Sequence, residues 1–99
     1  MTYPVILRNS SLMEEVDDEL SRAMELHKPQ NSFHEGYAVL LEEVDEFWEQ
    51  VKVNPKKLTP EQQAVRLAEI RKELIQIAAM ALRTIKDVVE KKGTEDVAR

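Results

Sequence analysis

The chain contains no cysteine, only two glycines and four prolines, and few aromatic residues: one Trp, two Tyr and two Phe. The absence of cysteine excludes a disulfide scaffold, a thiolate zinc site and a cysteine nucleophile. The scarcity of glycine and aromatic residues is atypical of a β-rich chain. The longest uninterrupted apolar run, Ile77–Leu82, is far shorter than the roughly 20 residues that a membrane span requires. We therefore expect no membrane partner.

Charge narrows the function classes further. Fourteen basic against nineteen acidic residues give a net charge of −5, which has the wrong sign for unaided binding of a phosphate backbone, so we expect no nucleic-acid partner. The first ten residues lack the basic start and the apolar core of a secretory signal, which favours a cytoplasmic protein. The length of 99 residues predicts one domain over residues 1–99.

The apolar periodicity predicts an all-α fold, an antiparallel helical bundle. We expect an extended arm over residues 1–9 and a frayed tail over residues 94–99. Ser11 and Glu14 stand three residues apart as in a capping box, which predicts that the first helix begins at Ser11. That helix should end before Pro29, because proline disfavours helical geometry at the preceding residue.

The second predicted helix runs from Ser32 or His34 to Lys52. The third begins at Thr59-Pro60, where an N-cap residue precedes a proline at the first helical position, and extends to Lys92 before Gly93. This helix is long for a globular protein, so we predict a kink or break near residues 67–71. Its apolar arc is wider than one packing partner requires, which predicts completion of the bundle as a homodimer or homotetramer.

Acidic residues occupy the border of the apolar stripe on two predicted helices. Glu43 and Glu46 lie within about 60° of each other on the helical wheel of the second helix. Glu73 and Gln76 occupy the same kind of border on the third helix. Two neighbouring helices would therefore bring three carboxylates and one amide to the same half-buried place.

Carboxylates that gather away from water need a compensating positive charge, because each raises the pKa of the others. A hard divalent cation with oxygen ligands supplies that charge. Mg²⁺ fits best, since it accepts one or two carboxylates together with substrate phosphates, and Mn²⁺ is a second candidate. From periodicity alone, however, a helical bundle with acidic edges stays the simpler interpretation.

Two stretches carry a resemblance to a known family: HEGYAVLLEEVDEFW at residues 34–48 and ELIQIAAMA at residues 73–81. The pattern Glu42-Glu43-x-x-Glu46, a gap of 26 residues and then Glu73-x-x-Gln76 resembles the EExxE and ExxD signature of the MazG-like all-α nucleoside triphosphate pyrophosphatases. Gln76 departs from that signature, which has aspartate at this position. The resemblance covers roughly residues 10–90.

The resemblance implies a magnesium-dependent hydrolase that converts a (d)NTP and water to a (d)NMP and pyrophosphate, with a metal-activated water attacking the α-phosphorus. It implies that Glu43, Glu46 and Glu73 are metal ligands, with Gln76 at the fourth ligand position. Glu42 would be a nearby ligand or the base that orients the water, so Glu42 and Glu43 are the candidate catalytic residues.

Three further residues are candidates for substrate binding. Arg83 continues the face of Glu73 and Gln76, and Lys86 follows it on the same helix; each is a candidate phosphate ligand. Trp48 is a candidate for stacking on the base, although its place on the apolar arc favours a core role. Two alternatives to an enzyme stay open: a catalytically weak nucleotide-binding or regulatory protein on this scaffold, and a purely structural oligomerisation module. A ferritin-like di-iron protein is less favoured, because its Glu-x-x-His elements are absent.

Overall fold

The computed structural model describes residues 5–91, which contain three α-helices and no strand. Helix α1 spans Val5–Leu26, α2 spans Phe33–Val51 and α3 spans Pro60–Thr84. A short 3-10 helix, Pro55–Lys57, lies in the connection from α2 to α3, and a π-helical turn, Ile85–Val89, directly continues α3. The expectation of an all-α fold is confirmed. No helix in the described part of the chain combines the length and apolarity needed to cross a membrane.

The predicted start of the first helix is wrong. Helix α1 begins at Val5, so residues 5–9 are helical and Ser11 lies inside the helix. Neither glycine nor proline occurs between Val5 and Leu26, so nothing in the sequence requires a boundary at the Ser11–Glu14 capping signature. The remainder of the predicted arm and the predicted tail over residues 94–99 lie outside the described residues.

The predicted starts of the other two helices are confirmed, and each start carries a side-chain cap. The Ser32 side chain accepts a hydrogen bond from Glu35 N (3.1 Å) at the start of α2. At the start of α3, Thr59 Oγ1 accepts from Gln62 N (3.1 Å) and Gln62 Oε1 accepts from Thr59 N (2.9 Å), a complete capping box.

The predicted break near residues 67–71 is wrong, because α3 is continuous there. The irregularity lies further along, in the π-helical turn Ile85–Val89. Within this turn Asp87 Oδ2 accepts hydrogen bonds from Arg83 Nε and from Gln30 N, both at 2.9 Å, and Val88 is buried. The helix thus departs from α geometry where tertiary hydrogen bonds converge, a feature that sequence periodicity does not encode.

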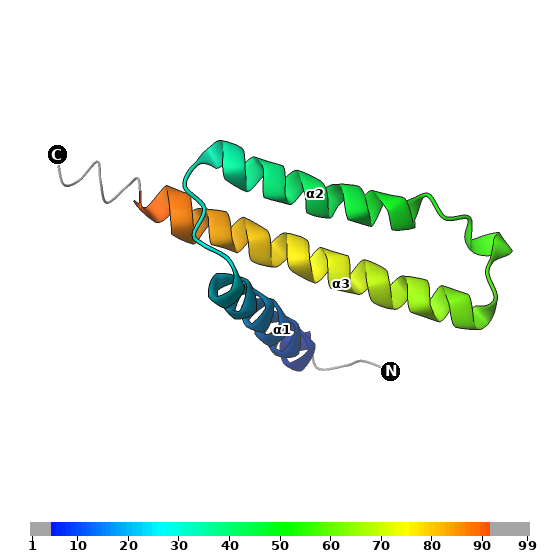
Figure 1. Cartoon of the computed structure of the whole chain (residues 1–99). Helices are drawn as coiled ribbons and strands as arrows, with labels where there is room; N and C mark the ends of the chain where they lie inside the picture. The colour runs from blue at the N-terminus through cyan, green and yellow to red at the C-terminus, as the bar shows by residue number, and fades with distance from the viewer. Residues whose placement is uncertain (1–4, 92–99) are drawn as a thin grey trace.

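The three helices run up, down and up, with α3 in contact with both of the others (Figure 1). Helix α2 is antiparallel to α3, since its start lies against Thr84 and Gln50 O near its end accepts from Arg66 Nε (3.0 Å). Helix α1 runs in the same direction as α3: Glu15 pairs with Arg71, and Ala23 O accepts from Arg83 (2.7 Å).

The apolar core is small and lies between α1 and α3. Val16, Leu20 and Ala79 form a buried cluster, against which Ile75, Ala78 and Met80 pack. Gly36 is the only buried residue of α2. The described chain is elongated and measures 58 × 32 × 21 Å. Large apolar side chains of α2 are therefore exposed at heptad spacing: Tyr37, Leu41, Val44, Trp48 and Val51.

Candidate metal centre

Three carboxylates from two helices meet between α2 and α3. Glu43 and Glu46 stand three residues apart on α2 and so share a helix face, and the antiparallel pairing places Glu73 of α3 opposite them. Each of the three offers one carboxylate oxygen, and these oxygens all lie within 4.8 Å of one another. We call Glu43, Glu46 and Glu73 the carboxylate cluster. The structure thus brings together the three acidic residues that the sequence predicted to share a site.

The electrostatics of the carboxylate cluster show that its charge is not balanced by a protein cation. Burial raises the pKa of Glu73 to about 7, and a hydrogen bond to Glu46 and the charges of Glu46 and Glu43 act in the same direction. Burial and the charge of Glu46 also raise the pKa of Glu43. Among residues 11–91, no Lys or Arg forms an ion pair with any of the three. The cluster is therefore an arrangement that a divalent cation would stabilise.

The amide of Gln76 lies against two of these carboxylates. When its nitrogen faces them, it donates to Glu43 Oε2 (3.0 Å) and to Glu73 Oε2 (3.2 Å). The opposite orientation of the amide places its oxygen at the same position, where it faces the same space as the carboxylate oxygens. Gln76 can therefore act as a hydrogen-bond donor to the cluster or as a neutral oxygen ligand.

A groove passes beside the carboxylate cluster. Two hollows of about 310 and 360 Å³ share Glu43, His27 and Met80 in their linings, so they adjoin. The first is also lined by Arg22 and Gln76, and the second by Lys28, Glu42 and Arg83. Glu42 therefore lies beside the cluster, on the wall of a groove large enough for part of a small ligand.

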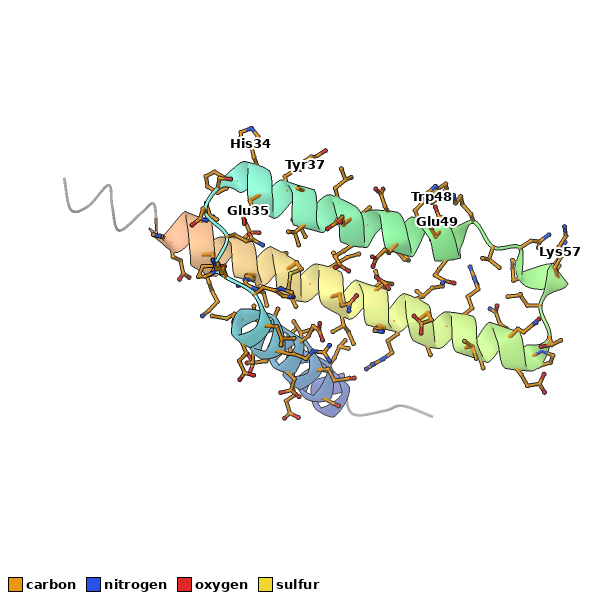
Figure 2. All side chains as sticks on the ribbon, viewed as in Figure 1. His34, Glu35, Tyr37, Trp48, Glu49 and Lys57 are labelled. Carbon is orange, nitrogen blue, oxygen red and sulfur yellow. The ribbon has the colours of Figure 1, made fainter. Side chains whose placement is uncertain are left out.

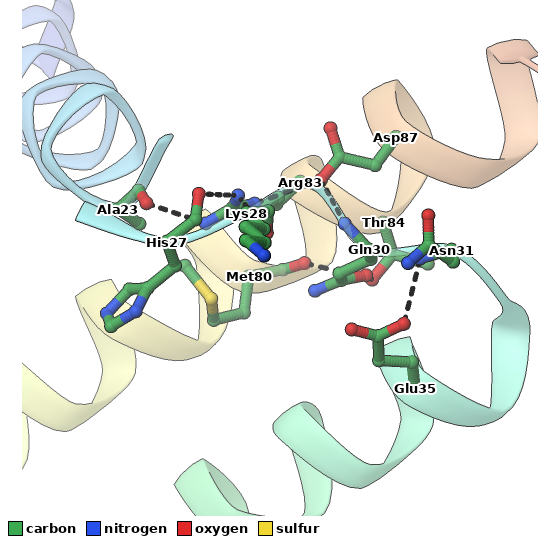
Figure 3. A network of polar contacts seen from close by, with 10 residues as sticks. All are labelled: Ala23, His27, Lys28, Gln30, Asn31, Glu35, Met80, Arg83, Thr84 and Asp87. Atoms are coloured by element: carbon green, nitrogen blue, oxygen red, sulfur yellow. Dashed lines mark hydrogen bonds and ion pairs between the residues drawn. The ribbon is translucent and has the colours of Figure 1, made fainter. Parts of the chain in front are cut away.

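Arg83 is engaged within the protein. Its side chain is 4% exposed, and it pairs with Asp87 through Nε (2.9 Å). Its other two nitrogens donate to Ala23 O (2.7 Å), His27 O (2.8 Å) and Lys28 O (2.8 Å), the backbone carbonyls at and just after the end of α1 (Figure 3). Arg83 borders the groove, but its hydrogen bonds give it a different role from the predicted one of phosphate ligand. It caps the end of α1.

Trp48 and Lys86 lie away from the carboxylate cluster. Trp48 is 53% exposed on the apolar stripe of α2, and in Figure 2 it lies on the edge of α2 away from α1, together with Tyr37. Lys52 Nζ stands 6.0 Å from the centre of the Trp48 ring. Lys86 is exposed, thirteen residues after Glu73, which is about 20 Å along a helix axis. Neither residue joins the site within this chain, and Trp48 is not in the core of this chain either.

Several residues of this region carry no motif in the sequence. His27, Lys28 and Met80 line the groove, Gln30 is buried at 4% exposure, and Gly36 lies directly against Thr84 of α3. The one signal for Gly36 is that a glycine occurs inside a predicted helix, which usually has a packing reason. His27, Lys28 and Gln30 lie in the connection between α1 and α2, and Met80 lies on α3. These four residues come together only because the connection folds back onto α3, which no local pattern predicts.

The chain was compared with known protein families, with curated proteins and with solved structures, and none of them matches.

Proposed function

We propose that this protein is a magnesium-dependent nucleoside triphosphate pyrophosphohydrolase of the MazG-like type, which converts a (d)NTP and water to a (d)NMP and pyrophosphate. The observation that carries the proposal is the carboxylate cluster, in which oxygens from Glu43, Glu46 and Glu73 lie within 4.8 Å of one another. These residues stand at the positions of the EExxE and ExxD pattern. The proximity of these oxygens therefore supports metal binding by the motif residues, which their spacing in the sequence alone leaves open.

The donor set suits a hard divalent cation. Glu43, Glu46 and Glu73 would hold Mg²⁺, or Mn²⁺ in its place, through oxygen atoms, and the Gln76 amide oxygen would be a fourth donor after the amide turns. When bound, the ion would neutralise phosphate charge and lower the pKa of a water molecule. The raised pKa values of Glu43 and Glu73 support this assignment, because both carboxylates gain stability from a nearby cation.

In the proposed reaction, a water oxygen forms a bond to the α-phosphorus while the bond from that phosphorus to the oxygen bridging the β-phosphate breaks. Pyrophosphate is the leaving group, and the proton of the water passes to a carboxylate. Glu42 is the candidate acceptor, since it lines the same hollow as Glu43. No covalent intermediate with the protein is required.

The groove beside the cluster is the proposed place for the nucleotide. Arg22 and Lys28 border its two hollows and carry positive charge, so they are better placed than Arg83 or Lys86 to meet phosphate oxygens. Trp48 faces away from this groove in one chain. A stacking role for Trp48 would therefore require a second copy of the chain.

We also propose that the chain forms a homodimer or homotetramer. The support is the heptad-spaced apolar stripe of α2, whose five large side chains are each at least 40% exposed. Size-exclusion chromatography with light scattering tests this proposal. A monomer at micromolar concentration would contradict it.

The function is tested by incubating the purified chain with Mg²⁺ and a panel of canonical and modified (d)NTPs, and by assaying pyrophosphate. We expect release of pyrophosphate with at least one nucleotide and none from the Glu46→Gln variant. Glu49→Gln is the matched control, because Glu49 is an exposed glutamate on the same helix that pairs with Lys52 (2.9 Å) instead of facing the cluster. Loss of activity in both variants would contradict a specific role for the cluster.

Gln76 favours a second candidate function, a nucleotide-binding or regulatory protein with weak catalysis. An amide in place of a carboxylate removes one negative charge from the site and weakens its hold on a second cation. Inactivity over the whole nucleotide panel, together with a nucleotide-dependent rise in melting temperature, would favour this candidate. Absence of both would leave a structural helical module.

A further inference from the structure

Helix α2 lies close against Thr84 of α3 at Gly36, two helical turns before Glu43. Gly36 is buried, and a β-carbon placed on it would lie 2.7 Å from Thr84 Oγ1 and 2.8 Å from Thr84 Cγ2. Contacts below 3.0 Å are essentially never made by real β-carbons, so only glycine permits this spacing. Thr84 is β-branched, and its hydroxyl donates to Gln30 Oε1 (2.7 Å) and to Met80 O (3.2 Å), so its side chain has little freedom to rotate away from an added methyl group.

The Thr84 side of this contact is held in place by a buried hydrogen-bond network. Thr84 Oγ1 donates to Gln30 Oε1 (2.7 Å), and Gln30 N donates to Asp87 Oδ2 (2.9 Å). Asp87 in turn pairs with Arg83, which holds the end of α1 (Figure 3). We call Gln30, Arg83, Thr84 and Asp87 the Arg83 network. None of its side-chain polar atoms is both buried and without a hydrogen-bond partner.

A second contact fixes the other end of α2. Arg66 Nε donates to Gln50 O (3.0 Å), so α2 is attached to α3 on both sides of the carboxylate cluster. Glu43 lies seven residues after Gly36, which is about 10 Å along α2, and the helix between them is regular. A displacement of the Gly36 end therefore moves Glu43 and Glu46 relative to Glu73.

We infer that Gly36 is a positioning residue for the carboxylate cluster, because its lack of a side chain lets α2 lie against Thr84; this inference rests on the proposed metal site. Their contact sets how closely α2 lies on α3, and this spacing sets the separation of the oxygens of Glu43 and Glu46 from those of Glu73. Neither residue touches the cluster. Metal sites need their donors within a few tenths of an ångström, so a small outward shift of α2 weakens cation binding.

The test measures Mn²⁺ binding to the full chain by titration calorimetry and by the electron paramagnetic resonance signal of free Mn²⁺. We expect Gly36→Ala to weaken Mn²⁺ binding by about tenfold or more, as changes outside the first ligand shell do at other sites. Alanine is a better helix former than glycine, so an effect on α2 alone would not weaken binding. Added Thr84→Ala removes the two closest atoms and leaves Gln30 Oε1 at 2.9 Å. That oxygen is the far end of a flexible side chain and loses its hydrogen bond to Thr84, so it can move aside, and Gly36→Ala/Thr84→Ala should regain most of the wild-type affinity.

Two controls separate spacing from general damage. Leu20→Ala removes a buried side chain from the α1–α3 core and should lower the melting temperature while leaving the Mn²⁺ affinity of the folded chain unchanged. Thr84→Ala alone keeps Gly36 and creates no clash, so it should bind Mn²⁺ as wild type does. If Gly36→Ala does not fold, Gly36→Ala/Thr84→Ser replaces it, with an affinity below that of Gly36→Ala/Thr84→Ala.

The outcomes distinguish the inference from the function on which it rests. Wild-type protein that binds no Mn²⁺ would overturn the proposed metal site itself. Wild-type affinity in folded Gly36→Ala would overturn the positioning role alone. A double variant as weak as Gly36→Ala, or Thr84→Ala as weak as Gly36→Ala, would also overturn it, because the loss would then not come from crowding between α2 and α3.

Discussion

Two polar clusters lie nearly three turns apart along α3, since Arg83 follows Glu73 by ten residues. They differ in how their charges are balanced. In the Arg83 network, a buried cation meets a carboxylate and three backbone carbonyls at 2.7–2.9 Å. In the carboxylate cluster, three acidic groups converge, and no ion pair to a Lys or Arg is found within residues 11–91. A buried charge with all of its partners in the chain holds the fold together. A group of like charges lacks such partners and is stabilised by something that binds.

The largest expected effect on stability comes from disrupting the Arg83 network. Arg83→Met leaves Asp87 without its cation and takes one donor from each of three backbone carbonyls, so we expect a loss of about 3–5 kcal/mol in the free energy of unfolding. Urea denaturation followed by circular dichroism measures this loss. The control is Arg71→Met, which removes an exposed, solvent-screened ion pair to Glu15 and should lower stability far less than Arg83→Met does. Equal losses in both variants would show that burial of the Arg83 pair adds nothing.

Removing a charge from the carboxylate cluster should have the opposite effect on stability when no metal is bound. Burial and the charge of Glu46 raise the pKa of the Glu43 carboxyl, which means that its ionised form is destabilised in the folded protein. Glu43→Gln removes this ionised group, so the metal-free variant should be at least as stable as wild type. Divalent cation at one hundred times its Kd should stabilise wild type by about 2.7 kcal/mol and the variant by much less. Thermal unfolding with EDTA and with Mg²⁺ measures both effects. A metal-free variant clearly less stable than wild type would place Glu43 in a structural role.

The contrast between the two clusters also explains what the sequence could predict. The carboxylate cluster is found from local spacing, because Glu43 and Glu46 share a helix face and Glu73 stands at the matching border of the next helix. The cap at Thr59 was predicted for the same reason, since it depends on residues at most three positions away. Short-range signals of this kind survive folding into the tertiary structure.

The Arg83 network could not be predicted in this way. It joins Arg83 to carbonyls more than fifty residues earlier in the chain, and backbone carbonyls carry no sequence signature. The same tertiary contacts meet at the π-helical turn Ile85–Val89, whereas the predicted kink or break was at residues 67–71. The early start of α1 is a different case: a capping signature marks where a helix is able to begin, and here the helix simply continues through it.

A substitution at Gln76 can add a further negative charge to the carboxylate cluster. Gln76→Asp adds a fourth carboxylate where the amide now faces Glu43 and Glu73, so Mn²⁺ binding should tighten by about tenfold, equivalent to about 1.4 kcal/mol. Without metal the added charge should lower stability, the reverse of Glu43→Gln. Titration calorimetry and thermal unfolding measure the two effects. Unchanged affinity would place Gln76 outside the ligand set.

The smallest expected effect is a pH dependence of stability that belongs to the carboxylate cluster. The pKa of Glu73 is raised from an ordinary value of 4.5 to about 7, so the folded, metal-free protein holds a proton that the unfolded chain releases. The stability that this proton provides is fully present below about pH 4.5 and is lost as the pH rises through about 7. Wild type in EDTA should therefore lose stability between about pH 5.5 and pH 8, and Glu73→Gln should lose less over the same range. Mg²⁺ should oppose the loss of stability, because the cation replaces the proton at high pH. An identical pH profile for wild type and Glu73→Gln in EDTA would contradict the raised pKa of Glu73, and with it the conclusion that the charge of the carboxylate cluster is not balanced by the protein.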